Sequence, residues 1–133
     1  MLKILIYCAL FSCCVTAEPI ETIDLHEFNS FINGKIIITR ISPDFVKRGG
    51  HWSLGSPIRF DLSKLISNAL AKLKKGTPKK WVFRHTTVQS YDSKNDEWYL
   101  ALMFGNDEGD IAVILCNMNG EVWKIGKKYD EFD

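Results

Sequence analysis

The chain has 133 residues, of which 46% are hydrophobic and 25% are charged, and these fractions are typical of one globular domain. The formal net charge is +1, which excludes a global positive field that would draw the protein to nucleic acid or to an anionic membrane. The length leaves no room for a second domain of ordinary size.

The first seventeen residues predict a secretory signal peptide. Lys3 supplies a positive charge, twelve apolar or small residues follow it, and the small residues Val15 and Ala17 precede the expected cut. The apolar run is shorter than the about 20 residues that a transmembrane helix needs. We therefore expect cleavage after Ala17 and export to the periplasm or the medium, with no transmembrane span in the mature chain. A buried N-terminal helix is the alternative.

The cysteines follow from this expected cut. Cleavage removes Cys8, Cys13 and Cys14, so the mature chain keeps only Cys116 and forms no internal disulfide. Its sixteen basic and sixteen acidic side chains balance. The sequence LFSC, which ends at Cys13, also resembles the lipobox of bacterial lipoproteins. A lipid anchor on Cys13 is therefore the alternative to simple secretion.

Residues 18–60 predict a loop-rich N-terminal extension. The sequence DLHEFNSFI at 24–32 favours a short helix capped by Asp24, and KIIITRI at 35–41 favours a strand because it is rich in β-branched residues. The glycines and prolines of 42–60 predict a glycine-rich loop.

Residues 62–75 predict one long amphipathic helix. Six apolar residues recur at the helical period: Leu62, Leu65, Ile66, Ala69, Leu70 and Leu73. Asp61 suits the N-cap because its carboxylate accepts from free amides of the first turn. Gly76 suits the C′ position just after the helix.

After residue 80 the apolar period changes from 3.6 to 2 and predicts four antiparallel strands. These are WVFRHTTVQSY at 81–91, EWYLALMFG at 97–105, IAVILCN at 111–117 and EVWKI at 121–125. The expected fold class is α+β, with one long helix packed on a four-stranded antiparallel meander over residues 61–126. The charged residues 127–133 predict a frayed tail.

The dipeptide Asn119-Gly120 predicts a two-residue hairpin turn with positive φ at both positions. In that register Met118 faces Glu121, and Cys116 lies beside Trp123 on one face of the sheet. We therefore expect Cys116 to be buried and unreactive, because burial raises the pKa of a thiol.

The segment from Phe60 to Ile125 resembles the small α+β units of secreted bacterial proteins of the PepSY-like and cystatin-like group. The matching features are Trp81 after the helix, DSKNDEWY at 92–99 and MNGEV at 118–122. The resemblance implies an exported location and a non-enzymatic role. It does not extend to protease inhibition, since TTVQSY lacks the glycine of the inhibitory cystatin loop.

Catalytic and metal-binding motifs are not evident in the sequence. The three histidines, His26, His51 and His85, lie far apart and form no pair at zinc-ligand spacing. The acidic stretches at 92–97 and 106–110 are typical of Asx turns and do not fit a calcium loop. The five lysines within residues 72–80 are typical of a solvated helix end, with a site for an anionic polymer as the alternative. We expect no metal and no cofactor.

The stretch RGGHWSLGSP at 48–57 is the preferred binding site, and its possible partner-binding residues are Arg48, His51 and Trp52. The sequence favours an exported, non-catalytic binding or interaction module, a monomer or weak dimer, whose partner is an envelope protein or polymer and not nucleic acid. The alternatives are a small acid–base enzyme that uses His51 or His85 with a neighbouring carboxylate, and a lipid-anchored envelope protein.

Overall fold

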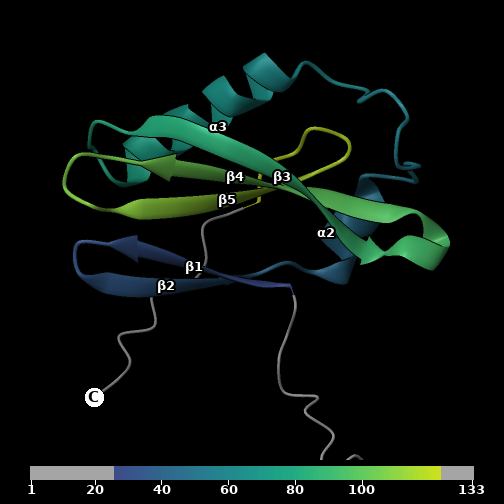
Figure 1. The fold of residues 1–133 in the computed structure, drawn as a ribbon, viewed down its shortest axis with the longest axis horizontal. Coiled ribbons are helices and arrows are strands. Elements are labelled where there is room, and N and C mark those ends of the chain that lie inside the picture. The colour runs from purple at the N-terminus through teal and green to yellow at the C-terminus, as the bar shows by residue number, and fades with distance from the viewer. Residues whose placement is uncertain (1–25, 124–133) are drawn as a thin grey trace, which may run out of the picture.

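The computed structural model describes residues 26–123, which form an α+β fold. Five antiparallel strands make one sheet in the order β2-β1-β5-β4-β3 (Figure 1). The elements are β1 (Glu27–Ile32), β2 (Lys35–Arg40), α2 (Pro43–Arg48), α3 (Leu62–Gly76), β3 (Val82–Asp92), the short 3-10 helix η1 (Ser93–Asn95), β4 (Glu97–Gly105) and β5 (Ile111–Asn117). The predicted α+β class is confirmed, whereas the predicted four-stranded sheet is wrong in strand number. The predicted signal peptide at 1–17 and the predicted frayed tail at 127–133 lie outside the described residues.

Helix α3 forms where its apolar stripe predicts it. The side chain of Asp61 accepts a hydrogen bond from the Lys64 amide at 3.2 Å, which confirms the N-cap. The predicted C′ role of Gly76 is wrong, because the helix includes this residue. Thr77 is the C-cap in extended conformation and donates its N–H to the carbonyl of Leu73. Pro78 follows, and a residue before proline disfavours the helical conformation.

The strands β3, β4 and β5 form the predicted meander, and α3 covers one of its faces. Strand alternation sends Trp98, Leu100, Leu102 and Phe104 to that face, where the stripe of α3 packs on them. Residues from Ala112 to Met118 are all buried, because both faces of β5 are covered. The apolar sequence of β5 correctly predicts its central position.

The predicted helix at 24–32 is wrong, because residues 27–32 form strand β1. Asn33 and Gly34 have φ values of 55° and 73°, and Ile32 pairs with Lys35. These features make a two-residue hairpin turn between β1 and β2. The predicted strand at 35–41 is confirmed as β2. β-branched pairing across the turn outweighs the weak helical spacing of the apolar residues in β1.

The β1–β2 hairpin covers the second face of the meander together with α2. β1 pairs with β5 at Phe31 and Ile111, and Ser30 Oγ then accepts the Val113 amide at 2.9 Å. Beyond this point β1 crosses the sheet, where the Phe28 and Tyr99 rings lie 6.0 Å apart. The second core comprises Ile41, Phe45, Val46, Tyr99, Ala101, Val113 and Leu115. Strands β4 and β5 are therefore buried on both faces, whereas β3 is mostly exposed.

The predicted hairpin at Asn119-Gly120 is wrong in loop length. Asn117 donates its N–H to the Glu121 carbonyl, so three residues form the loop. Gly120 has a φ of 81°, whereas neither Met118 nor Asn119 has a positive φ. Cys116 then pairs with Val122 rather than lying beside Trp123. The side chain of Asn117 accepts the amides of both Asn119 and Glu121, and these bonds stabilise the longer loop. Of the predicted fourth strand at 121–125, the described residues show only the isolated bridge between Cys116 and Val122.

Candidate functional site

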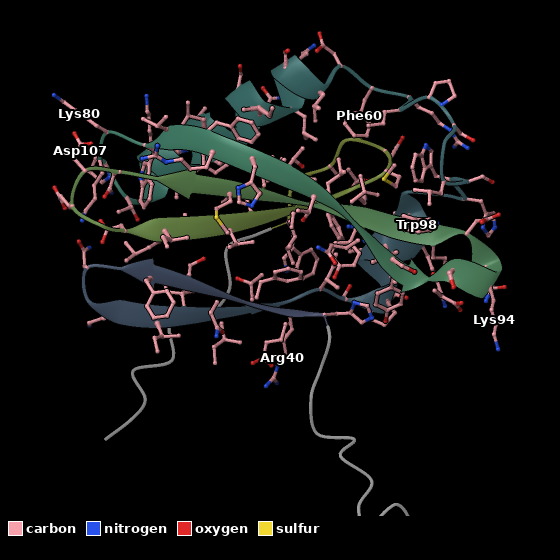
Figure 2. The ribbon with its side chains drawn as sticks, in the orientation of Figure 1. Arg40, Phe60, Lys80, Lys94, Trp98 and Asp107 are labelled. Atoms are coloured by element: carbon pink, nitrogen blue, oxygen red, sulfur yellow. The ribbon has the colours of Figure 1, made fainter. Side chains whose placement is uncertain are left out.

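A hollow of about 360 Å³ lies where the C-terminal end of α2 approaches the β3–β4 turn. It is lined by Lys47, Gly50, His51, Asn95 and Glu97. We call it the Glu97 hollow. Lys94 marks this end of the sheet in Figure 2, and Trp98 marks the neighbouring core position. Its volume is at the lower end of the range for small-molecule sites in proteins.

The wall at 92–96 is an Asx-stabilised turn that holds Asn95 in place. Asp92 accepts hydrogen bonds from the Lys94 amide at 3.1 Å and from Asn95 Nδ2 at 2.7 Å. The hydrogen bond from Asn95 is the main cause that holds the pKa of Asp92 below its ordinary value of 3.8. Asp96 then takes a left-handed conformation, with φ of 52°, and directs the chain into β4. The predicted Asx-turn reading of this acidic stretch is confirmed.

The opposite wall is the loop that follows α2, and hydrogen bonds attach it to its surroundings. His51 Nδ1 lies 2.6 Å from the Asn95 carbonyl oxygen, and the Trp52 amide donates to the Asp96 carbonyl at 3.0 Å. Arg59 donates to the His51 carbonyl at 2.6 Å. These contacts fix both walls relative to each other without closing the hollow.

Gly49 allows this loop to approach the β5 hairpin. A Cβ atom at Gly49 would lie 2.7 Å from the Met118 amide nitrogen, so any side chain here would push the two segments apart. The carbonyl of Phe45 also accepts a hydrogen bond from the buried Asn117 side chain at 3.0 Å. Both contacts fix the end of α2, and therefore the position of Lys47, against the sheet.

Glu97 is the unusual member of the site. It is the first residue of β4 and keeps 9% of its surface exposed. Its Oε2 atom is buried and has no hydrogen-bond partner in the part of the chain that the structure describes. A buried carboxylate without a partner is costly, because a charged oxygen loses its hydration and gains no replacement. Thr86 Oγ1 and Trp98 Nε1 are also buried with no partner within residues 26–123, but neither residue lines this hollow.

The structure separates the three residues that the sequence singles out as a binding site. His51 is exposed and lines the hollow. Trp52 does not, because its ring is 6% exposed and packs edge-on against Trp98 at 5.8 Å. Arg48 is directed elsewhere: its guanidinium donates to Glu121 at 3.4 Å and lies over the Phe45 ring. Of the three residues, only His51 lines this hollow, and a partner-binding role for Arg48 and Trp52 stays a prediction.

Sequence reasoning missed Lys47, Asn95 and Glu97. The sequence predicts a turn at Asn95 and the start of a strand at Glu97, and neither prediction indicates a binding site. The alternation of β4 gave a signal for Glu97, since residues 97–105 are apolar apart from this first residue. No sequence feature places Lys47 beside that turn, because α2 itself was not predicted.

Helix α2 corrects the prediction of a loop over 42–60. Ser42 caps it by accepting the Phe45 amide at 3.1 Å, and Pro43 occupies the first turn, where a missing N–H costs nothing. Phe45 and Val46 are buried against the sheet. A single turn and a half of helix carries too few residues for the 3.6-residue period to be recognised.

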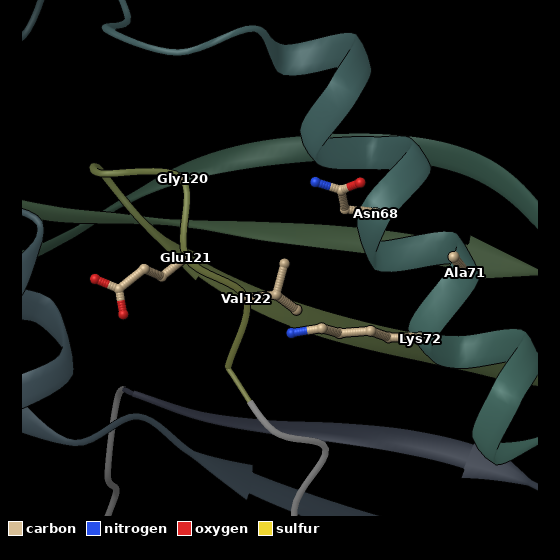
Figure 3. A pocket seen from close by; sticks show the side chains of 6 residues that line it. All are labelled: Asn68, Ala71, Lys72, Gly120, Glu121 and Val122. Atoms are coloured by element: carbon tan, nitrogen blue, oxygen red, sulfur yellow. The ribbon is translucent and has the colours of Figure 1, made fainter.

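A second hollow, of about 430 Å³, lies between α3 and the hairpin after β5. Its lining residues are Asn68, Ala71, Lys72, Gly120, Glu121 and Val122 (Figure 3). The side chain of Lys72 extends from α3 toward Val122, whereas Glu121 points away from the helix (Figure 3). Asn68 and Lys72 are exposed, and none of the polar side chains that line it is buried. This hollow has no buried polar atom that requires a ligand.

Cys116 lies on the α3 face of β5 and is fully buried. Burial raises the pKa of its thiol to about 12, and the positive charge of Lys72 acts in the opposite direction. The thiol therefore stays protonated near neutral pH. The predicted burial of Cys116 is confirmed, and a protonated thiol is a poor nucleophile.

The remaining histidines lie apart from the hollow. His85 is exposed on β3, and His26 Nδ1 lies 3.0 Å from the Tyr99 hydroxyl. Within residues 26–123, no group of three histidine, cysteine or acidic side chains is arranged to hold a metal ion. Over the same residues, no helix has the length and apolar character needed to cross a bilayer.

The second acidic stretch, at 106–110, forms a closed polar corner with Lys79. Asn106 Oδ1 accepts the amides of Glu108 and Asp110, which confirms the predicted Asx turn. Lys79 donates to both Glu108 and Asp110. The hydrogen bond to Asp110 is the main cause that raises the pKa of Lys79. Lys79 is therefore an ion-pair partner and not part of a free basic patch.

Comparison with protein-family models gives no match for this chain. Comparisons with curated proteins and with solved structures give no match either. The resemblance to PepSY-like and cystatin-like domains therefore stays a prediction.

Proposed function

We propose that this protein is a non-catalytic binding module and that the Glu97 hollow is its ligand site. The observation that carries the proposal is the buried Oε2 atom of Glu97, which has no partner within the described residues. Rotation of the Glu97 side chain into the hollow lets a ligand donate a hydrogen bond to this atom, which removes the cost of the unpaired group. An unpaired buried carboxylate in a hollow is typical of a binding or catalytic site, because a purely structural carboxylate is stabilised by partners of its own.

The preformed walls of the hollow also support a binding role. His51 is hydrogen-bonded to Asn95, and the Trp52 amide to the Asp96 carbonyl, so little ordering is needed when a ligand enters. The volume of about 360 Å³ favours a small ligand or the end of a larger one. An envelope protein or polymer that presents such a group fits this proposal as well as a free small molecule.

A fragment screen by NMR tests the binding role. We expect members of a library that contains cationic, anionic, zwitterionic and neutral fragments to shift the amide signals of residues 47–51 and 95–97 in the ¹⁵N-labelled full chain. His51→Ala should weaken these shifts, and His85→Ala, which alters an exposed histidine on β3, is the matched control. If no fragment of any charge shifts these signals, the hollow is not a ligand site.

Export is a separate part of the proposal. The signal-peptide pattern of residues 1–17 supports it. N-terminal sequencing of the protein recovered from a bacterial expression host tests it: a mature chain that begins at Glu18 is the expected result. A chain that begins with a lipid-modified Cys13 would identify the envelope-anchored alternative, and an uncleaved chain would contradict export.

A small acid–base enzyme is the second candidate function. The observation that favours it is that His51 and Glu97 line the same hollow. Proton transfer requires a hydrogen bond between each group and a bound substrate. A broad hydrolase panel distinguishes the two functions. Turnover that His51→Ala abolishes would favour the enzyme, and ligand binding without turnover would favour the binding module.

A further inference from the structure

We infer that the ligand of the Glu97 hollow is a small zwitterion, whose ammonium group binds Glu97 and whose carboxylate binds Lys47. The inference rests on the proposed function, since it names the ligand class of the same site. It follows from the charges and hydrogen-bonding roles of the lining residues.

Glu97 requires a cationic donor. An ionised carboxylate is an acceptor only, and its Oε2 atom has no donor among the described residues. Hydrogen bonds in which both donor and acceptor carry charge are about twice as strong as neutral ones. An ammonium group with its three donors therefore matches this atom better than a hydroxyl or an amide does.

His51, which lines the same hollow, has a second acceptor to offer an ammonium group. Its Nδ1 atom lies 2.6 Å from the carbonyl oxygen of Asn95, and a carbonyl oxygen only accepts, so Nδ1 carries the proton. In the neutral ring the remaining nitrogen, Nε2, is then an acceptor. The hydrogen bond from Nδ1 to the Asn95 carbonyl thus leaves Nε2 of the neutral ring free to accept from an ammonium ligand.

Lys47 supplies the opposite charge. It is exposed in the last turn of α2, and no ion pair within the described residues involves it. Glu97 and Lys47 line one hollow without pairing to each other. A purely cationic ligand would be attracted by Glu97 but repelled by Lys47. A purely anionic ligand would be attracted by Lys47 but repelled by Glu97. A zwitterion satisfies both groups.

A metal ion fits the hollow less well. One histidine and one glutamate line it, whereas zinc sites use three or four protein ligands. The described residues contain no group of three such side chains. Lys47 would also repel a divalent cation.

The test compares L-alanine with its two single-charge analogues, ethylammonium and propionate, by calorimetry and NMR titration of the full chain. Charge-assisted hydrogen bonds of this kind change affinity by about tenfold or more. We expect L-alanine to bind about tenfold more tightly than either analogue. 4-Aminobutyrate, compared with butylammonium and butyrate, applies the same test at a longer separation of the two charges. If neither zwitterion binds more tightly than its analogues, the inference is overturned.

Two variants assign the charges. Glu97→Gln should weaken binding of the preferred zwitterion about tenfold, while Lys47→Met should weaken the zwitterion and not the alkylammonium. Glu108→Gln, the same change in an exposed carboxylate outside the hollow, should leave the affinity unaltered. Glu97→Gln should also raise the melting temperature of the free protein, which excludes unfolding as the cause of lost binding. Unaltered affinity in Glu97→Gln would overturn the inference.

Failure of the inference and failure of the proposed function are distinguishable. If other fragments shift the signals of residues 47–51 and 95–97 and the zwitterions do not, the hollow binds a ligand of another class and the inference is overturned. If no fragment shifts them, both are overturned.

Discussion

The two ends of the sheet hold two buried carboxylates in opposite states. Asp110 lies near the end that Asp107 and Lys80 mark in Figure 2, and its oxygens accept from the Asn33 amide at 3.1 Å, from Asn106 Nδ2 at 2.9 Å and from Lys79. Glu97, near the Lys94 end, has a buried oxygen with no partner among the described residues. The difference shows that burial of a carboxylate does not identify its role, whereas its hydrogen bonds do.

Asn106→Ala should have the largest effect, because it removes the side chain that organises the Asp110 corner. The substitution leaves the amides of Glu108 and Asp110 without an acceptor and takes a donor from Asp110. We expect the free energy of unfolding to fall by about 3 kcal/mol, measured by urea denaturation. Asn68→Ala, an exposed asparagine on α3, is the control and should have little effect. Equal losses in the two variants would contradict the special status of the corner.

Cys116→Ala sets the scale for a buried group that carries no charge. We expect a loss of about 1–2 kcal/mol from a small cavity, and at least as large a loss for Cys116→Ser because it buries a hydroxyl. Ligand binding at the hollow should be unchanged in Cys116→Ala. Maleimide labelling of the native protein should be far slower than that of a free thiol. Fast labelling would contradict the buried position.

The raised pKa of Cys116 also predicts an alkaline limit to stability. The unfolded thiol loses its proton near pH 9.0, whereas the folded thiol keeps it up to about pH 12. Since the unfolded state binds fewer protons in this window, the contribution of Cys116 to stability falls as the pH rises from 9 to 12. Urea denaturation at several pH values in this range measures the slope. Cys116→Ala, which has no thiol to ionise, should show a smaller slope.

Glu97→Gln should stabilise the protein, whereas the corresponding neutral substitution Asp110→Asn should destabilise it. Removal of the unpaired buried charge should raise the free energy of unfolding by about 1 kcal/mol in the absence of ligand. Asp110→Asn should lower it, because three donors lose a charged acceptor. Thermal unfolding of the two variants tests the comparison directly. A loss of stability in both would mean that the two carboxylates play the same structural role.

Acid should weaken the two turns through their aspartates, and we expect this effect to be the smallest. Hydrogen bonding to Lys79 is the main cause that holds the pKa of Asp110 below 3.8, and the pKa of Asp92 is lowered by its bond to Asn95. As the pH falls below 3.8, the unfolded state takes up these protons first, so stability is lost as the pH falls through the folded pKa values. Denaturation at decreasing pH measures this loss. Asp92→Asn should reduce its slope, and an unchanged slope would contradict the assignment.

The elements that the sequence predicts best are those whose pattern is long. The stripe of α3 and the alternation of β4 are each decided by burial of one whole face, and both are confirmed. Two turns contain the dipeptide Asn-Gly and yet differ in structure. Asn33-Gly34 forms a two-residue turn, whereas Asn119-Gly120 lies in a three-residue loop that Asn117 stabilises. The hydrogen bonds made by surrounding residues decide which of the two turns forms, and the dipeptide itself does not specify them.

The candidate site is predicted less well than the fold. His51 is found by its place in a glycine-rich loop, but Lys47 and Glu97 come from a short helix and from the start of a strand about fifty residues away. Their approach depends on Gly49 lying against Met118 and on the bond from His51 to Asn95. Such long-range contacts leave no periodic signal in the sequence, so the site could be recognised only from the folded chain.

The position of β1 in the sheet constrains the order in which this protein folds. The β1–β2 hairpin lies at the beginning of the described chain, but its sheet neighbour is β5, at the end, through Phe31 and Ile111. During synthesis the hairpin emerges first and has no neighbour until some eighty residues later. An isolated two-stranded hairpin is at best marginally stable in water. The second core therefore forms late and all at once, and a chain truncated before β5 should be unable to keep even its earliest strands.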